Sequence, residues 1–177
     1  LEGEAPNAAY YRAVDGAWCG RFEFIVTDWR AFGAAPLGIL DRLRLLSMVY
    51  GERLFGALRI ETTVSASGAA DAVVVHTTRV SKWGMTLMRS VDTLVLARNG
   101  RDLTMRIAMR LAPTLWRARV SPPSPASVDA DGRCASYRFP WLGTEMRQRG
   151  ERSRDGSTVT LTQETAFSRG VQVLRRR

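Results

Sequence analysis

The chain contains 177 residues, of which 45% are hydrophobic and 24% charged, and these proportions exclude a wholly disordered chain. We therefore expect residues 1–177 to form a single globular domain. The formal net charge is +9, but Lys82 is the only lysine and the arginines are spread along the chain, which favours a compositional bias over a polyanion-binding surface and excludes nucleic acid as the expected partner.

Residues 5–15 predict a short N-terminal helix that Gly16 ends. The next segment, residues 14–29, contains Gly16-Ala17-Trp18 and then alternates apolar and polar residues, which predicts a first strand with a buried and a wetter side.

Residues 36–56 predict a second, longer helix that starts at Pro36. Its apolar residues at helical spacing form a stripe, which we expect to face a core or to cap an opening: Leu37, Leu40, Leu43, Leu46 or Ser47, Tyr50 and Leu54. A position on a membrane surface is less favoured for this helix, because Asp41 and Glu52 nearly cancel the charges of Arg42, Arg44 and Arg53.

After residue 56 the pattern is one of strands separated by turns. The expected strands are residues 57–67, 72–83, 85–97, 103–111, 114–120, 133–139, 144–153, 157–167 and 171–177. Turns are predicted at Asn99-Gly100 and Asp155-Gly156, and a loop at 121–127. The fold class is thus all-β with one or two short helices. An all-β meander of this length must protect its edges, and we expect a single antiparallel up-and-down barrel of about 8–10 strands.

The order of these elements resembles the calycin superfamily, which includes lipocalins and intracellular fatty-acid-binding proteins. The resemblance covers nearly the whole chain and includes the Gly-x-Trp step at Gly16 and Trp18. It implies that Trp18 closes one end of the barrel beneath an arginine near the chain end, either Arg169 or Arg175. The helix before the second strand resembles the lid of the fatty-acid-binding branch. The chain departs from lipocalins in lacking a long helix after the eighth strand and a Thr-Asp-Tyr motif.

The strand at 72–83 has polar residues on both faces, since His76 and Thr78 alternate with Thr77 and Arg79. The strand at 157–167 also has polar residues on both faces, since Gln163 alternates with Thr162 and Glu164. Polar groups inside a barrel cost about 1–3 kcal/mol each unless they are hydrogen-bonded, which suggests an interior that binds something. The alternative is a threonine-rich outer face and a His76 that a neighbour satisfies. The residues predicted to bind a ligand are His76, Thr78, Arg79, Trp83, Arg89, Gln163 and Glu164.

Methionines at 85, 88, 105 and 109 would give this interior an adaptable lining or core. An arginine that faces inward, from among Arg79, Arg89, Arg147 and Arg149, would bind a carboxylate. If Met146 and Gln148 face inward instead, the arginines beside them face solvent.

Metal and cofactor sites have little support in the sequence. Cys19 and Cys134 lack metal-ligand spacing, and two free buried thiols are favoured over a disulfide. His76 is the only histidine, so haem ligation by this residue is a minor alternative and no cofactor or metal is expected. The sequence contains no apolar stretch of about 18 residues, so no transmembrane segment is predicted.

Catalytic motifs are also missing. Ser90, His76 and Asp92 lack a nucleophile elbow, and Glu61, Glu145 and Glu164 are expected to form ion pairs with arginines. No catalytic residue is assigned, and whether the chain is an enzyme stays open, with the balance towards a non-enzyme.

Three functions remain. The first is a non-catalytic carrier or sensor that binds a small apolar or amphipathic molecule, fatty-acid or lipid-like, in a cavity of several hundred Å³ beneath the helix at 36–56. The second is an enzyme on the same barrel that uses His76, Asp92 or Glu164 in acid/base chemistry on an amphiphilic substrate. The third is an arginine-rich polyanion-binding module. The cytoplasm is favoured over other compartments without being fixed, and the oligomeric state is open.

Overall fold

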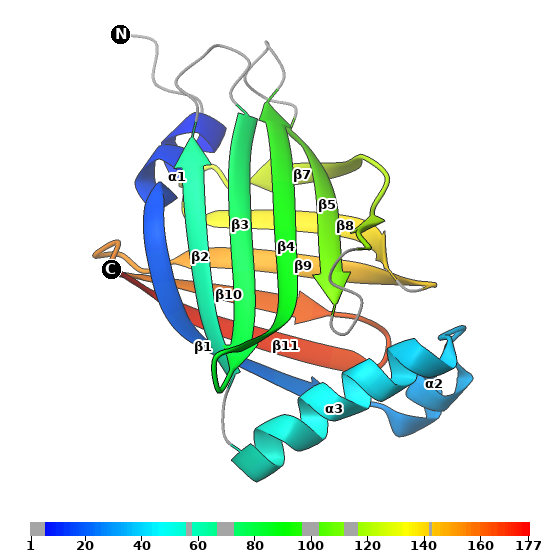
Figure 1. The fold of residues 1–177 in the computed structure, drawn as a ribbon. Coiled ribbons are helices and arrows are strands. Elements are labelled where there is room, and N and C mark those ends of the chain that lie inside the picture. The colour runs from blue at the N-terminus through cyan, green and yellow to red at the C-terminus, as the bar shows by residue number, and fades with distance from the viewer. Residues whose placement is uncertain (1–5, 56–57, 67–72, 97–102, 112–116, 142) are drawn as a thin grey trace, which may run out of the picture.

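Ten strands form a closed antiparallel β-barrel in which neighbours in the chain are neighbours in the sheet (Figure 1). The computed structural model describes residues 6–55, 58–66, 73–96, 103–111, 117–141 and 143–177. The barrel strands are β1 (Gly16–Val26), β2 (Leu58–Ala66), β3 (Val73–Lys82), β4 (Met85–Leu96), β5 (Leu103–Leu111), β7 (Ser124–Val128), β8 (Cys134–Trp141), β9 (Thr144–Arg152), β10 (Thr158–Glu164) and β11 (Ser168–Arg176). The two-residue β6 (Arg119–Val120) pairs with β5. This architecture confirms the predicted fold class.

Three helices accompany the barrel: α1 (Pro6–Val14), α2 (Trp29–Ala34) and α3 (Ile39–Phe55). The N-terminal helix and the helix between the first two strands were both predicted. The short α2 was not predicted, and its start is set by Asp28, whose Oδ1 accepts hydrogen bonds from the backbone N–H groups of Arg30 (2.8 Å) and Ala31 (2.9 Å).

The barrel closes where the first strand meets the last. The register of β1 and β11 runs from Trp18–Arg176 to Val26–Ser168. On the opposite wall, β4 pairs with β5 from Met88–Leu111 to Leu96–Leu103. Strand β7 makes the shortest contacts between adjacent barrel strands. Its register with β5 runs only from Leu103–Ala126 to Met105–Ser124, and its register with β8 only from Ala126–Tyr137 to Val128–Ala135.

Most predicted strands agree with the observed ones, and β5 has the predicted bounds. The predicted loop at 121–127 is wrong in part, because residues from Ser124 onward form β7. Pro125 is tolerated in this strand because it lies exposed at the short β5–β7 contact, where a missing N–H disturbs few hydrogen bonds. Of the predicted strand at 114–120 only residues 119–120 form a strand, and residues 114–116 lie outside the described residues, as do the predicted turn at 99–100 and its flanks.

Helix α1 closes one end of the barrel around Trp18. The indole Nε1 donates a hydrogen bond to the carbonyl oxygen of Val14 (2.8 Å), and the guanidinium of Arg176 lies 5.0 Å from the ring centre. Arg176 also donates to the carbonyl oxygen of Ala13 (2.7 Å). The resemblance implied Arg169 or Arg175 for this role, and that implication is wrong, because Arg176 is the residue in register with Trp18.

Helix α3 lies across the other end, which we call the lid end (Figure 1). Its packed side carries Leu45, Met48 and Val49, which belong to or pack against the main core. The predicted apolar stripe does not pack against the main core. Four of its members, Leu40, Leu43, Tyr50 and Leu54, are exposed, whereas Leu37 is buried in a small separate cluster with Phe32 and Phe167.

The two cysteines lie on β1 and β8, which are not adjacent strands, and both thiols are free. Both residues are half-buried rather than buried, which corrects the expectation in that respect. No described helix is long and apolar enough to cross a membrane.

Arg176 provides a test of the α1 end. Replacing Arg176 by alanine removes the contact with the indole and the hydrogen bond to Ala13, and we expect the free energy of unfolding to fall by about 1–2 kcal/mol. The neighbouring Arg175 is exposed, so Arg175→Ala serves as the matched control with an expected change within about 0.5 kcal/mol. Urea unfolding measures both, and equal effects would show that Arg176 does not hold this end together.

Candidate functional site

The lid end contains a cavity of about 60 Å³ between α3 and the barrel wall. Its lining is predominantly apolar and includes Phe22, Phe24 and Trp141 from the barrel and Leu45 from α3. A second cavity, of about 20 Å³, lies near α1. The sequence predicted a cavity of several hundred Å³, and neither cavity reaches that size. The reason is that large side chains fill the interior, among them Trp18, Tyr137 and Phe139, each less than 5% exposed.

Methionines are concentrated around the lid-end cavity. Four of the six methionines of the chain line it: Met48, Met88, Met109 and Met146. Methionine side chains are unbranched and change rotamer easily, so a wall built from them adapts to the shape of a guest. Of the predicted lining residues, Met88 and Met109 lie in the cavity wall, Met105 lies in the core and Met85 is exposed.

A charged group stands beside this cavity. Arg44 of α3 donates from Nη1 to Oδ1 of Asp41 (2.8 Å), and Arg119 of β6 donates to Oδ2 of the same carboxylate (2.7 Å). The side chains of Arg44 and Asp41 are both nearly buried, and both residues line the cavity. The group therefore carries two positive charges and one negative charge at the boundary between an apolar cavity and the surface. Sequence reasoning missed Arg44 as a site residue.

The middle of the barrel contains a buried carboxyl group. Asp92 of β4 points into the core, and burial raises its pKa from 3.8 to about 7, although a hydrogen bond from Ser90 lowers it. Oδ1 of Asp92 has no hydrogen-bond partner among the described residues. The cross-strand neighbour of Asp92 on β3 is His76, whose side chain lies outside the described part of the chain.

Glutamine side chains add further polar groups to the interior. Nε2 of Gln163 donates to Oε1 of Gln148 (3.2 Å), and Gln163 lines the lid-end cavity. Gln172 is 3% exposed, and its Oε1 has no partner among the described residues. Near α1, the hydroxyl groups of Tyr11 and Tyr137 form a 2.6 Å hydrogen bond, and burial raises the pKa of both phenols.

Two of the predicted ligand-binding residues, His76 and Thr78, lie on the inward row of β3 by register. Position 76 pairs with Val64 and Asp92, and position 78 pairs with Thr62 and Ser90, all of which are buried. The side chains at 76 and 78 are outside the part of the chain that the structure describes. Gln163 is thus the predicted ligand-binding residue whose described side chain reaches the lid-end cavity.

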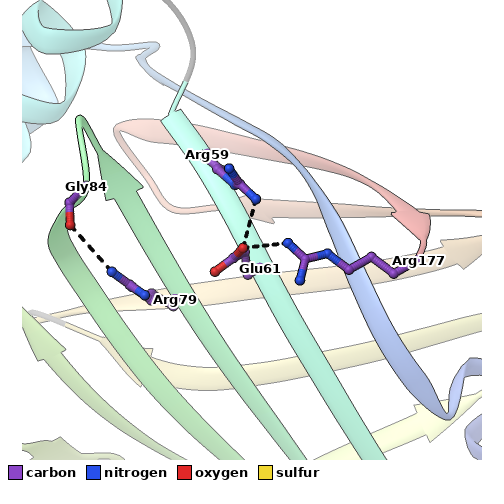
Figure 2. A network of polar contacts seen from close by, with 5 residues as sticks. All are labelled: Arg59, Glu61, Arg79, Gly84 and Arg177. Carbon is purple, nitrogen blue, oxygen red and sulfur yellow. Dashed lines mark hydrogen bonds and ion pairs between the residues drawn. The ribbon is translucent and has the colours of Figure 1, made fainter.

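Arg79 and Trp83 line an open groove on the outside of the barrel. Figure 2 shows Arg79 there with Arg59, Glu61 and Gly84. Arg79 donates to Oγ1 of Thr86 (2.9 Å) and to the carbonyl oxygen of Gly84 (3.5 Å). In the same groove, Glu61 accepts from Arg59 (3.0 Å) and from Arg177 (2.7 Å). These side chains satisfy one another on the surface.

Arg89 and Glu164 are also exposed, and Glu164 forms an ion pair with Arg169 (3.5 Å). Together with Glu61–Arg59 and Glu145–Arg147 (2.9 Å), this pair confirms that the three glutamates bind arginines. Met146 and Gln148 face inward, which leaves Arg147 and Arg149 facing solvent. None of the four arginines considered for a carboxylate-binding role, Arg79, Arg89, Arg147 and Arg149, therefore faces the barrel interior.

The geometry limits acid/base chemistry. Asp92 is enclosed in the core and Glu164 is on the outer surface, so these two groups share no pocket. Ser90 donates directly to Asp92, whereas a Ser-His-Asp triad needs an imidazole between the two. Among the described residues, no three histidine, cysteine or acidic side chains are placed to hold a metal ion.

A scan against protein-family models matches no family, and a search of curated proteins finds no significant relative.

The raised pKa of Asp92 predicts a pH-dependent stability. Between about pH 4 and pH 7 the folded protein retains a proton that the unfolded chain has released, so the free energy of unfolding falls as the pH rises through this window. We expect the wild type to lose about 2 kcal/mol relative to Asp92→Asn between pH 5 and pH 8.

Urea unfolding at the two pH values measures this difference. The control is Asp155→Asn, because hydrogen bonds from Ser153 and Ser157 lower the pKa of exposed Asp155 to about 2, and its titration lies below the window. A wild type and an Asp92→Asn variant with parallel pH profiles would show that Asp92 is not a buried, protonated acid.

Proposed function

We propose that the protein is a non-catalytic carrier or sensor that binds a small amphipathic molecule at the lid end. The apolar part of the molecule enters the cavity beneath α3, and its polar group binds beside Arg44. The observation that carries this proposal is the juxtaposition of a methionine-lined cavity with a nearly buried arginine. An apolar pocket with one well-placed polar group is the usual form of a small-molecule site.

The cavity must enlarge to accept such a guest, because about 60 Å³ holds only a few atoms. Two features supply the extra room. The methionine side chains change rotamer at low cost, and α3 is a separate helix laid over the opening rather than part of the barrel wall. Helices α2 and α3 are tied together by Arg42, which donates to the carbonyl oxygens of Phe32 (2.9 Å) and Ala35 (2.8 Å), so we expect them to move as a unit.

Arg44 favours an anionic polar group. Asp41 shares its two oxygens between Arg44 and Arg119, so a carboxylate of the guest can replace Oδ1 of Asp41 on Arg44 while Oδ2 stays on Arg119. The exchange conserves the number of charged hydrogen bonds and leaves no buried charge without a partner. A lipid-like carboxylate or a similar anionic amphiphile fits this site.

Kinship with calycins also belongs to this proposal. The support is the order of elements, the helices between β1 and β2, and the stacking of Arg176 on Trp18. On this interpretation residues 1–177 are one lipocalin-like domain, and α3 corresponds to the lid of the fatty-acid-binding branch.

A fluorescent fatty-acid analogue tests binding in the cavity. We expect saturable binding to the wild type and a loss of at least tenfold in affinity for Met109→Trp, because the larger side chain fills the space beneath α3. Met85→Trp is the matched control, since Met85 is 58% exposed and outside the cavity. Equal affinities for the wild type and both variants would place the binding site elsewhere, and the absence of saturable binding would refute the proposed function.

A second comparison tests Arg44. Replacing Arg44 by glutamine should weaken the carboxylate analogue about tenfold and leave the corresponding alcohol unchanged, because only the carboxylate loses a charged hydrogen bond. Arg53→Gln changes an exposed arginine of the same helix and should affect neither ligand. Competition titrations of both ligands with the wild type and the two variants measure these affinities, and an equal loss for acid and alcohol would assign Arg44 a purely structural role.

A further inference from the structure

The outward side of α3 is apolar. Ile39, Leu40, Leu43, Tyr50 and Leu54 project from it and are 50–77% exposed; we call them the α3 outer face. They lie on the opposite side of the helix from Leu45, Met48 and Val49, which pack on the barrel. A surface helix of a globular protein normally presents charged and polar residues to water, so two apolar sides on one helix indicate that the outer one has a partner.

A second exposed apolar group lies at the same end of the barrel. The β3–β4 turn consists of Trp83 and Gly84, and both have positive φ angles, 48° and 79°. Trp83 is 67% exposed and Met85 beside it is 58% exposed. The turn belongs to the lid end, because Met88, a few residues along β4, lines the cavity together with residues of α3. Figure 1 shows the β3–β4 turn at the same end of the barrel as α3.

The conformation of Trp83 is costly for folding. A two-residue turn of this kind prefers asparagine or glycine at its first position, because bulky residues rarely adopt a positive φ. Trp83 therefore weakens the hairpin and gains little burial in return, although Nζ of Lys82 lies 5.9 Å from the centre of its ring. The residue is better explained by what it contacts outside the protein than by the stability of the turn.

The charges around this surface are basic. Four described carboxylates at the lid end are engaged, whereas Glu23, between the cavity-lining Phe22 and Phe24, is exposed. The four are Asp28, which caps α2, Asp41, which binds two arginines, Glu145, which binds Arg147, and Glu164, which binds Arg169. Arg30 and Arg53 are exposed and form no ion pair with a described residue. Of the two acids expected to offset the arginines of α3, Asp41 is turned towards the barrel and does not act at the surface, and the side chain of Glu52 lies outside the part of the chain that the structure describes.

We propose that the α3 outer face and the Trp83 turn dock on an anionic lipid surface. Leucine side chains of α3 insert below the headgroups with the helix parallel to the membrane, and Trp83 sits at the interface where its ring is partly solvated. Exposed arginines beside them bind the phosphates. A second copy of this chain fits less well, because pairing two lid ends brings like charges together in a protein of net charge +9.

The experiment is flotation of the purified protein with phosphatidylcholine vesicles, with and without phosphatidylglycerol, and without added ligand. We expect binding to the anionic vesicles that weakens as salt is raised, and little binding to the neutral ones. Leu43→Glu should reduce the partition coefficient at least tenfold, since it removes one inserted side chain and adds a repelled charge. Val95→Glu, at an exposed apolar position on the outside of β4, should not change it.

Trp83→Asn separates docking from folding. Asparagine tolerates a positive φ, so the variant should be at least as stable as the wild type towards urea. Its affinity for the anionic vesicles should nevertheless be several-fold lower, because the indole ring is gone. A variant that floats like the wild type would remove Trp83 from the docking surface and overturn this part of the proposal.

Three results would overturn the proposal as a whole. The first is equal flotation of the wild type and Leu43→Glu, and the second is no flotation of the wild type with anionic vesicles. The third is a wild type that sediments as a dimer without lipid while Leu43→Glu sediments as a monomer, which would make a second copy the occupant of the α3 outer face. None of these results depends on ligand binding in the cavity, and we expect Met109→Trp to bind vesicles like the wild type.

Discussion

Closure of the sheet is the constraint from which the other features follow. Because β1 pairs with both β2 and β11, and β4 pairs with β5, each strand has its inward face set by two neighbours. A slip of one residue in any strand would turn its core side chains outward. The approach of β1 to β11 is so close that a Cβ at Gly20 would lie 1.8 Å from the carbonyl oxygen of Val173, so this position requires glycine. The closed ring leaves its two ends as the places where helices and ligands can act.

The sequence predicted the barrel well because alternation is unambiguous in strands such as β5, where Leu103, Met105 and Ile107 are all buried and the residues between them are not. It also predicted β3 as a strand but left its inward face open, since polar residues occupy both of its faces. Its inward face is decided by its neighbours: Val80 stands between Ile60 and Met88, and all three are buried. Arg79 then stands opposite Glu61 on the outside. Register is a property of strand pairs, so a single strand with mixed faces does not contain this information.

The candidate site was predicted less well than the fold. Helical spacing identified Leu40, Leu43 and Leu54 as one face of α3, and that grouping holds, but spacing does not say which face packs inward. The signal that was available is the pair Asp41 and Arg44, which lies on the same side as Leu45 and Met48. Charges on a packed face are expensive unless they are paired, so an acid and an arginine three residues apart beside such positions mark a place where a charged group is required. Gln163 was predicted because its strand mixes polar and apolar residues on one face.

The two sides of α3 link the cavity to the surface of the protein. Moving α3 away from the barrel exposes Leu45, Met48 and Val49 and loses their burial, which opposes opening in water. An apolar phase at the outer face reduces that loss, because side chains that leave the barrel no longer enter water. A partner can shift the position of α3 only by as much as it prefers the displaced helix over the closed one. In the proposed docking, the exposed leucines contact such a phase in both positions of α3, whereas the packed residues contact it only after displacement. The inner face of α3 would therefore determine whether docking opens the cavity.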